Sequence, residues 1–273
     1  RLDRHLRALP NRAPTDGRDS VLVIGAGLTG IEVACHMPDR LKAAGIGSGR
    51  VLLADRLGHI GSDMGEHARP VIDQALEVLG VETRTAIEVA AVEDGGVTLA
   101  DGERIAADTV IWCAGMVASP LAECLPGARD RCGRLPVDEF MKLKGIENVY
   151  AAGDIAEAML TDEHASVMSC QHARPMGRFA GYNAVSDLLG EERLALRIPN
   201  YSTCLDLGPE GAVQTQGWNR LVFETGAAAK RTKQIINCVR IYPPASGDRS
   251  EILAAAAPEV QAPPGQLGEL ADA

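Results

Sequence analysis

The sequence predicts an α/β fold built on a parallel, doubly wound sheet of the Rossmann type. Three observations support this prediction. Residues 21–24 are a continuous apolar run of strand length, which suits a strand buried on both faces. A glycine-rich turn at residues 25–30 follows and opens a helical stretch. A second apolar run, residues 51–54, ends at Asp55, so strand, helix and strand form one right-handed βαβ unit.

The other elements of this domain follow in order. We expect helices at Thr29–Ala44 and Val71–Leu79, the second stopping at Gly80. Asp-Gly dipeptides, which are typical of hairpin turns, separate short pieces at residues 81–84, 87–92, 97–99 and 104–106. We expect a small antiparallel meander inserted here, after a βαβαβ half. Thr109–Trp112 then returns to the parallel sheet.

The remaining sequence is less regular. We expect a strand at Asn148–Ala152 and a helix at about Cys170–Leu189, followed by a turn-rich mixed region to residue 245. The segment after Ser246 is rich in Ala, Pro and Glu and shows no periodicity. We expect this tail to be mobile.

Composition excludes several function classes. A net charge of −10 and only 3% aromatic residues among 273 argue against nucleic acid as a partner. No apolar run is long enough to span a membrane, so any membrane contact would be peripheral. The seven cysteines form no C-x-x-C pair and do not cluster with histidine, which predicts no metal site and indicates reduced, mostly buried thiols of a cytoplasmic protein.

The glycine-rich turn has the spacing G-x-G-x-x-G. Gly25 permits the tight turn, Gly27 lets a pyrophosphate approach the backbone, and Gly30 allows close packing of helix on strand. With Leu28 and Thr29, these residues are the candidate dinucleotide-binding turn, because the helix N-terminus offers free N–H groups and a positive dipole. The alternative is a glycine-rich turn without a ligand.

Asp55 ends the second strand. A carboxylate there can accept the ribose hydroxyls of an adenosine and would repel a 2′-phosphate, which favours NADH over NADPH. Arg50 and Arg56 lie close in the sequence and weaken that preference. The alternative is a polar strand end without a binding role.

Three segments in order resemble the two-dinucleotide flavoprotein reductases, which include glutathione reductase, ferredoxin reductases and type II NADH dehydrogenases. They are VLVIGAGLTGIEVA at residues 21–34, TVIWCAG at 109–115 and GIENVYAAGD at 145–154. The resemblance implies that Cys113, Ala114 and Gly115 lie beside the NAD site, although Cys113 departs from the family's usual residue. It also implies that Gly153 and Asp154 form the second flavin motif, in which the aspartate binds the ribityl chain of FAD.

The segment SCQHARPMG at residues 169–177 resembles the A-Q-x-A-x-x-x-G helix start of the type II NADH dehydrogenases, with Cys170 in place of alanine. The resemblance implies that Gln171 lies by the flavin ring where the second substrate approaches, and His172 is included with it as cofactor-binding. Pro175 is tolerated in a first helical turn, which indicates a helix beginning about there. The dipole at this helix start would favour an anionic reduced flavin. The alternative for Gln171 is a polar residue without chemistry.

Glu32 lies two residues after Gly30. In the resembling enzymes this glutamate lies near the nicotinamide and the flavin, which makes Glu32 and Gln171 the candidate catalytic residues. A surface glutamate favoured by the helix dipole is the alternative for Glu32. Neither His36 nor His172 is assigned a role as an acid.

A complete family member has a further G-x-G-x-x-G for the FAD pyrophosphate, and this sequence has no second copy. We therefore expect a segment on the order of 100 residues or more ahead of Arg1. The expected organisation is a connector from that segment (1–18), the NAD(H)-binding domain (19–116), the C-terminal part of the FAD-binding domain (117–190), a C-terminal interface domain (191–245) and the tail (246–273).

The leading functional hypothesis is an enzyme in which NADH reduces FAD and the electrons pass to a quinone or another small acceptor. The alternatives are a disulfide reductase with its cysteine pair in the absent segment, a sulfide-oxidising flavoprotein, for which Cys170 is the only support, and a nucleotide-binding module without turnover. A cytoplasmic location is expected, and peripheral contact with the inner face of the membrane and a homodimer are compatible with the sequence. Lys230, Arg231 and Lys233 lie on a predicted short helix, which we interpret as solvated or dimer-facing.

Overall fold

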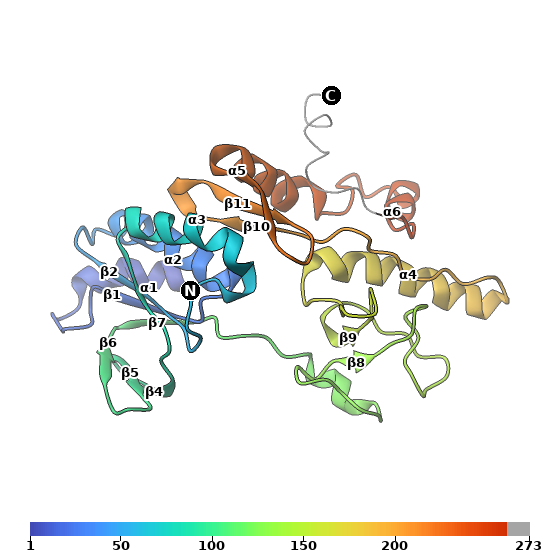
Figure 1. The fold of residues 1–273 in the computed structure, drawn as a ribbon, viewed down its shortest axis with the longest axis horizontal. Coiled ribbons are helices and arrows are strands. Elements are labelled where there is room, and N and C mark those ends of the chain that lie inside the picture. The colour runs from blue at the N-terminus through green and yellow to red at the C-terminus, as the bar shows by residue number, and fades with distance from the viewer. Residues whose placement is uncertain (261–273) are drawn as a thin grey trace. The chain divides into compact units, whose positions relative to one another are not determined.

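The structure is a computed structural model that describes residues 1–260. The chain forms two compact units, which we describe separately (Figure 1). The first unit comprises Arg1–Gly115 and Ser202–Ile235, and the second comprises Met116–Tyr201 and the chain from Ile236 onward. The predicted domain at residues 191–245 is therefore divided between the two units.

The first unit contains a four-stranded parallel sheet in the order β3-β2-β1-β7. Its strands are β1 (Ser20–Ile24), β2 (Arg50–Ala54), β3 (Val81–Arg84) and β7 (Thr109–Trp112). Helix α2 (Leu28–Ala43) connects β1 to β2, and α3 (Gly65–Val78) connects β2 to β3. The predicted α/β fold class is confirmed, although α3 begins six residues earlier than the sequence indicated.

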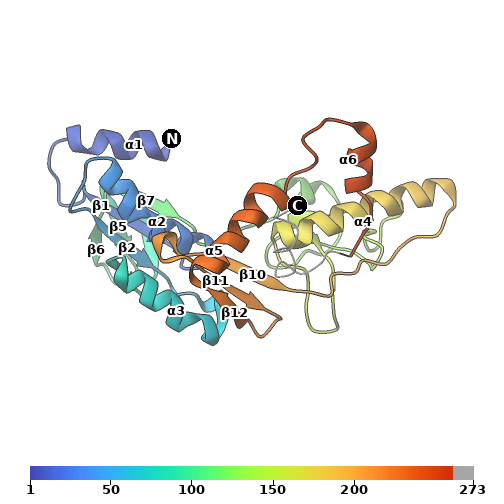
Figure 2. The same cartoon turned by 90° about the horizontal axis from the view of Figure 1, so that it is seen from above.

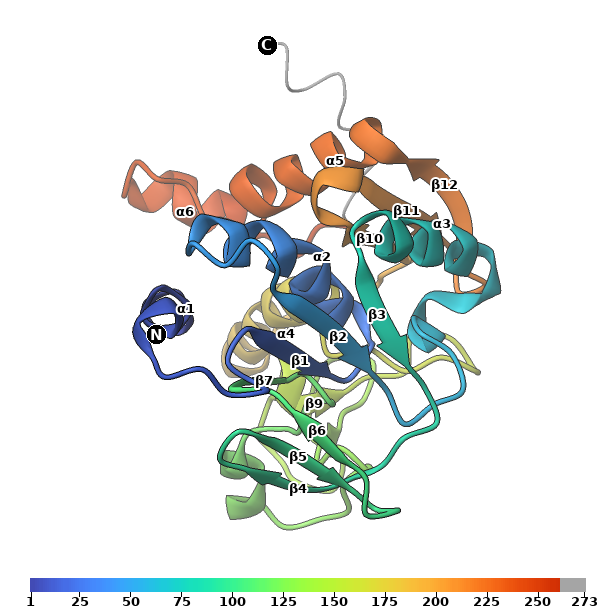
Figure 3. The ribbon, with the colours of Figure 1, turned by 90° about the vertical axis from the view of Figure 1, so that its left-hand side faces the viewer.

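The two faces of this sheet pack against different elements. Val21, Val23, Val51 and Leu53 join the core formed with α2 and α3, whereas alternate residues such as Leu22 and Leu52 pack against the meander. This alternation follows from the two-residue period of a strand. The meander consists of β4 (Val89–Glu93), β5 (Gly96–Leu99) and β6 (Arg104–Ala106). Figure 3 shows the helices on one side of the sheet and the meander on the other.

The N-terminal segment belongs to the first unit. Helix α1 (Leu2–Ala8) continues into a short 3₁₀ turn at Leu9–Asn11. Leu6 and Leu9 are buried in the same core as α2 and α3, and His5 Nε2 lies 2.9 Å from Thr109 Oγ1 on β7. The predicted connector therefore packs on the first unit, against the core of α2 and α3 and beside β7.

Residues 202–235, in the region that the sequence predicted to be turn-rich and mixed, form a small sheet followed by a helix. The antiparallel strands are β10 (Ser202–Asp206), β11 (Ala212–Gln216) and β12 (Leu221–Thr225), followed by α5 (Gly226–Ile235). Leu205, Leu207 and Val213 enter the core that contains α2, which explains why this segment forms one unit with residues 1–115. Helix α3 lies beside β12 (Figure 2).

The second unit is organised around α4 (Cys170–Leu189), which begins and ends where the sequence predicted. Pro175 is its sixth residue and not part of its first turn, so the carbonyl of Gln171 has no amide N–H to accept from. The described strands here are the short β8 (Leu135–Pro136) and β9 (Ala156–Glu157). Met176 and Phe179 of α4 pack in a core with Val137 and Met141.

Two expectations for this unit are wrong. The predicted strand at Asn148–Ala152 is not formed, because only Tyr150 makes a bridge, to Lys142, and a strand needs a neighbouring strand along its length. The predicted tail contains a short helix, α6 (Arg249–Ala255), in which the side chain of Asp248 accepts from Glu251 N at 3.0 Å. A π-helical segment, Ile236–Arg240, follows α5. The predicted mobility of residues 261–273 lies outside the described residues.

Across residues 1–260, none of the helices has the length and apolar character needed to cross a bilayer.

Candidate functional site

The glycine turn between β1 and α2 accepts no side chain at two of its positions. Gly25 has φ +97°, and a Cβ there would lie 2.6 Å from the backbone C and O of Cys113. A Cβ on Gly30 would lie 1.7 Å from the carbonyl oxygen of Gly25. The turn is therefore held tightly between the start of α2 and the end of β7, as the G-x-G-x-x-G pattern predicts.

The amides of the first turn of α2 have no side-chain cap among the described residues. Gly27 is the N-cap residue, and no side chain of the described chain caps the helix. The first backbone bond within the helix runs from Ile31 N to Gly27 O at 3.1 Å, so the amides of Leu28, Thr29 and Gly30 precede it. Uncapped amides and the positive end of the dipole form the electrostatic environment that a pyrophosphate requires.

Asp55 lies beside this turn. Its Oδ2 accepts a hydrogen bond from Ala26 N at 2.5 Å, and its Oδ1 accepts one from Leu57 N at 2.7 Å. The side chain of Arg56 is exposed. Arg50, in contrast, begins β2 at the opposite end of the strand and pairs with Glu82 through two bonds of 2.8 and 2.6 Å. Arg50 is therefore near Asp55 in the sequence but not in the structure, and the expectation that it weakens the preference set by Asp55 is wrong.

The residues that follow β7 pack against the glycine turn between β1 and α2. Cys113 N donates to Ile24 O at 2.7 Å, and Gly115 N donates to Cys113 O at 3.0 Å. Ala114 and Gly115 are exposed, Gly115 with φ +107°. Burial raises the pKa of the Cys113 thiol, so this thiol stays protonated at neutral pH. The structure thus brings Cys113 against Gly25, the first glycine of the turn.

Glu32 contacts the C-terminal sheet and helix α5 of the same unit. Its Oε1 accepts from Lys233 Nζ on α5 at 2.7 Å and from Asp206 N on β10 at 3.1 Å. Lys233 Nζ also donates to Cys204 O at 2.7 Å. Glu32 therefore joins α2 to the C-terminal sheet of the same unit, a role that neither of its predicted alternatives described.

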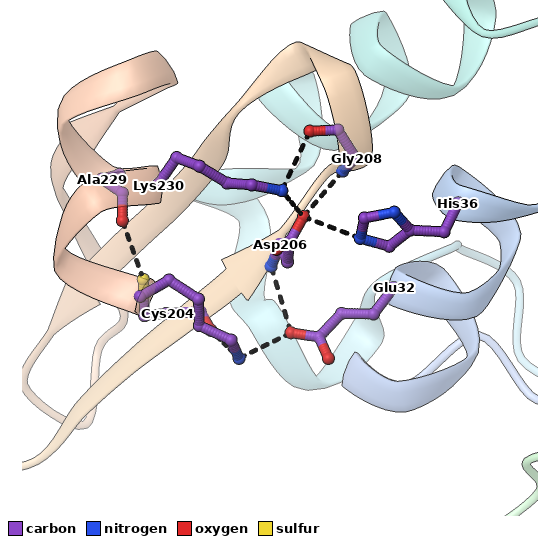
Figure 4. Close-up of polar contacts among 8 residues, drawn as sticks. Glu32, His36, Cys204, Asp206, Gly208, Ala229 and Lys230 are labelled. Carbon is purple, nitrogen blue, oxygen red and sulfur yellow. Dashed lines mark hydrogen bonds and ion pairs between the residues drawn. The ribbon is translucent and has the colours of Figure 1, made fainter. Parts of the chain in front are cut away.

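Asp206 is the centre of this charge network. Lys230 and His36 approach its carboxylate from either side, and Gly208 N donates to Oδ1 at 2.8 Å (Figure 4). Burial acts to raise the pKa of Asp206, but the bonds from Lys230 and Gly208 outweigh burial and the pKa is lowered. The side chains of Lys230 and Lys233 are only 23% and 16% exposed, so the interpretation of this basic helix as solvated is wrong for these two lysines.

Sequence reasoning missed this network. The only signal available was the i, i+3 spacing of Lys230 and Lys233, which places two ammonium groups on one face of a helix. That spacing does not identify the carboxylates they meet, because Glu32 and Lys233 are separated by 201 residues.

In the second unit, the two segments with flavin-like patterns lie side by side. Gly153 has φ +75°, and a Cβ there would lie 3.6 Å from Ala173 Cβ on α4. Asp154 is exposed in the short turn Gly153–Ile155. The structure thus brings the predicted ribityl-binding aspartate next to the start of α4.

Gln171 and His172 differ in accessibility. Gln171 is half-buried, and its Nε2 donates to Asn200 O at 3.4 Å. His172 has 0% exposure, its Nδ1 accepts from Val167 N at 2.8 Å, and its ring lies 5.5 Å from that of Tyr201. Burial lowers the pKa of His172 to about 4. This placement gives His172 a packing role and argues against the predicted contact with a cofactor.

The start of α4 can accommodate part of a flavin. The Ser169 hydroxyl at the N-cap is buried and has no hydrogen-bond partner among the described residues, and no side chain caps the helix. A buried hydroxyl without a partner is costly unless a ligand or water completes it. Together with Gly153 and Asp154, these groups fit a polar ligand such as a ribityl chain.

The thiols are more exposed than the sequence predicted. All seven cysteines are free; only Cys35 is buried, whereas Cys124, Cys170 and Cys238 are exposed. Among residues 1–260, no three His, Cys, Asp or Glu side chains are grouped to hold a metal ion.

A parallel sheet with a glycine turn after its first strand and a carboxylate after its second defines a dinucleotide-binding α/β protein. The family model described as pyridine nucleotide-disulphide oxidoreductase matches residues 3–177. The chain belongs to this family of NAD(P)H oxidoreductases.

The chain is similar to curated proteins of the same class. It is 58% identical over 268 residues to the NADH dehydrogenase-like protein Rv1812c of Mycobacterium tuberculosis, covering 97% of this chain and 67% of that protein. It is 28% identical to the demethylphylloquinone reductase NdbB of Synechocystis, covering 71% of this chain and 48% of that protein.

Solved structures share the fold. A NAD-dependent persulfide reductase from A. fulgidus superposes with a TM-score of 0.58 at 22% identity, covering 72% of this chain and 36% of that one. The LpdA structure from Mycobacterium tuberculosis gives a TM-score of 0.54 at 20% identity, covering 73% and 40%. The chain therefore spans well under half the length of these two neighbours, and their likeness concerns the fold alone.

Proposed function

We propose that the protein is an FAD-dependent NADH oxidoreductase whose electron acceptor is a quinone-like small molecule. The observation that carries the proposal is the uncapped, glycine-lined start of α2 with Asp55 beside it. When bound, FAD supplies the two-electron redox chemistry, accepting a hydride from NADH. The residues of this chain bind and orient the two cofactors.

The nucleotide site favours NADH. The amides of Leu28, Thr29 and Gly30 would receive the pyrophosphate, and Asp55 would accept the ribose hydroxyls. Arg50 forms an ion pair with Glu82 at the far end of β2. Arg56, which follows Asp55 directly, is therefore the nearby basic residue that could bind a 2′-phosphate. Charge repulsion from Asp55 then disfavours NADPH.

The flavin would be held by the second unit. Asp154 would accept a ribityl hydroxyl, and Gly153 would allow close approach of the backbone. The Ser169 hydroxyl and the uncapped start of α4 offer donors toward the same ligand. Gln171, on the first turn of α4, would border the acceptor.

The names of relatives support a quinone-like acceptor. NdbB is a demethylphylloquinone reductase, and a protein 30% identical over 162 residues is the type II NADH:quinone oxidoreductase NdhA of Mycobacterium tuberculosis. Both matches cover less than half of the relative, 48% and 34%, so the acceptor stays a proposal for this protein.

Flavin colour and acceptor ranking test the proposal. The purified protein should be yellow, should bleach on addition of NADH, and should turn over faster with a soluble quinone than with ferricyanide, oxygen or a disulfide. A colourless protein that still binds NADH would indicate a nucleotide-binding module. Fastest turnover with a disulfide would indicate a disulfide reductase.

A substitution at Asp154 tests the proposed flavin contact separately. Asp154→Ala should lower the flavin content on purification, because losing a hydrogen bond to a charged group costs about 1.5–3 kcal/mol. Asp162→Ala, at an exposed aspartate of the same unit, is the matched control and should keep full flavin content. Full occupancy in Asp154→Ala would remove this residue from the site.

A further inference from the structure

A groove of about 430 Å³ lies between helix α3, strand β3 and the loop after β2, all in the first unit. A volume of this size suits a small ligand. The bottom of the groove is apolar, because Ile60, Leu76 and Val81 are buried there. Figure 3 shows β3 as the outermost strand of the parallel sheet. In the described chain, the groove therefore borders a sheet edge that no other strand covers.

One buried donor in the groove has no partner. The Nε atom of Arg69 is shielded from solvent and makes no hydrogen bond to a described residue. The Arg69 guanidinium also forms no ion pair with a described carboxylate. A buried N–H without an acceptor is costly unless a ligand or water accepts from it. Because the rigid fork of a guanidinium fits the two oxygens of a carboxylate, this part of the groove suits a carboxylate.

The other end of the groove carries negative charge. Asp73 and Glu77 line it, one and two turns along α3 from Arg69. Both acidic residues are exposed, and within residues 1–260 neither forms an ion pair. From Arg69 to Glu77 the helix rises by about 12 Å. An ammonium group is complementary to these carboxylates, so the groove separates a place for an anion from a place for a cation.

Strand β3 offers backbone groups between these two ends. Arg84 O accepts a hydrogen bond from Asp55 N at 2.9 Å, so Arg84 turns its polar backbone groups toward β2. The N–H and C=O groups of successive strand residues point to opposite sides, so those of Thr83 face the outer edge of the sheet. The side chains of Thr83 and Thr85 line the groove. An extended peptide can form hydrogen bonds with an edge of this kind.

We propose that this groove binds a peptide of about three residues with free termini, at a site separate from the proposed nucleotide contacts. The peptide carboxylate meets Arg69, and its ammonium group meets Asp73 and Glu77. Since α3 connects two parallel strands, it runs antiparallel to them, and its start with Arg69 lies toward the end of β3. The bound peptide therefore runs parallel to β3. Three extended residues span about 10 Å, which matches the length of α3 between Arg69 and Glu77.

Triglycine and its two blocked forms test the proposal without any substitution. Binding to the full chain is measured by calorimetry at low salt. Triglycine should bind, whereas triglycine amide, which lacks the carboxylate, and N-acetyl-triglycine, which lacks the ammonium group, should each bind about tenfold more weakly. No binding of triglycine, or equal affinities for the three peptides, would overturn the proposal.

Two variants assign each terminus of the peptide to its end of the groove. Arg69→Gln should weaken binding of triglycine about tenfold and leave binding of triglycine amide unchanged. Asp73→Asn/Glu77→Gln should weaken binding of triglycine and leave binding of N-acetyl-triglycine unchanged. Arg12→Gln and Glu66→Gln, at exposed positions of the same unit, are matched controls and should bind triglycine as the parent chain does. An Arg69→Gln variant that still prefers triglycine to its amide would contradict the proposed site.

An excess of NAD⁺ separates the groove from the proposed nucleotide site. The loop after β2 reaches both places, because Gly61 N donates to Ala26 O in the glycine turn at 3.0 Å. Triglycine should still bind when NAD⁺ is present. Competition between the two would show that the groove is part of the nucleotide site, and the proposal would fail. None of these readouts needs flavin or turnover, so this failure is distinct from failure of the proposed function.

Discussion

At the scale of single residues, the carboxylate of Asp55 connects two parts of the proposed nucleotide site. One oxygen accepts from Ala26 in the glycine turn, and the other accepts from Leu57 in the loop after β2. Its position is therefore fixed before a ligand arrives, which reduces the entropy that binding would cost.

Asp55→Asn should narrow the preference for NADH over NADPH. An amide keeps one acceptor oxygen but loses the charge that repels a 2′-phosphate, so the ratio of kcat/KM for the two nucleotides should fall by roughly tenfold, or about 1.4 kcal/mol. Steady-state kinetics with both nucleotides measures this ratio. Asp94→Asn, in the exposed hairpin between β4 and β5, is the control. An unchanged ratio in Asp55→Asn would place Asp55 away from the ribose.

His172 should make the second unit sensitive to acid. Burial lowers its pKa from 6.5 to about 4, so the unfolded chain binds a proton at a pH where the folded chain does not. The stability is thus present above pH 6.5 and is lost as the pH falls from there toward 4, by about 3 kcal/mol in total. Denaturant unfolding followed between pH 7 and 4 measures the loss.

A variant isolates the contribution of this histidine. His172→Gln should flatten the pH dependence of unfolding in that window, even if its stability at pH 7 is lower. His67→Gln, at an exposed histidine of the first unit, should keep the dependence of the parent chain. An equally steep profile in His172→Gln would assign the acid sensitivity to other groups.

At the scale of elements, helix α2 contacts two different groups of strands. Its N-terminal glycines pack against β1 and the end of β7, while Glu32 and His36, one turn apart, face β10 and α5 through Lys233 and Asp206. The helix that carries the proposed nucleotide site therefore contacts the C-terminal sheet and α5 of the same unit. Partly buried ion pairs of this kind are costly to break singly, because the remaining charge loses its partner.

Gly30→Ala should disrupt the junction of β1 with α2. A Cβ would lie 1.7 Å from the Gly25 carbonyl oxygen, and a backbone atom cannot move away as a flexible side chain can. Overpacking typically costs about 1–3 kcal/mol, and this contact should reach or exceed the upper value. Urea unfolding measures the effect. Gly47→Ala, with nothing within 4 Å of the added Cβ, is the control, and equal stability of the two variants would contradict the packing shown here.

At the scale of the whole molecule, the proposed nucleotide contacts and the proposed flavin and acceptor contacts fall in different compact units. Asp55 and Cys113 belong to the first unit, and Asp154 and Gln171 belong to the second. Under the proposed function, reduction by NADH and oxidation by the acceptor are consecutive half-reactions that use different residues.

Gln171→Ala should separate these half-reactions. Oxidation of the reduced enzyme by quinone should slow by roughly tenfold, the loss expected for one hydrogen bond, while reduction by NADH should change little. Stopped-flow absorbance resolves the two steps, and Gln234→Ala at an exposed position of α5 is the control. Slowing of the NADH step alone would place Gln171 on the nucleotide side.

The sequence by itself determined the central α/β architecture. Continuous apolar strands, glycine turns and helical periods are local signals, and they located β1, β2, β7 and both ends of α4 to within one residue. The same local signals predicted the meander, because Asp-Gly turns specify hairpins. The glycine turn is also a local requirement, since the positive φ of Gly25 and the missing Cβ of Gly30 are properties of the residues themselves.

Only the tertiary structure decided which side chains meet across long distances in the chain. Glu32 and Lys233 have no sequence pattern in common, and Arg50 is near Asp55 in sequence but at the opposite end of β2. Asn148–Ala152 has the composition of a strand and yet forms none in this chain, because strand formation depends on a neighbour. Periodicity reports the face of an element that is buried, whereas contacts between distant residues depend on how the elements pack, and a single sequence does not encode that information locally.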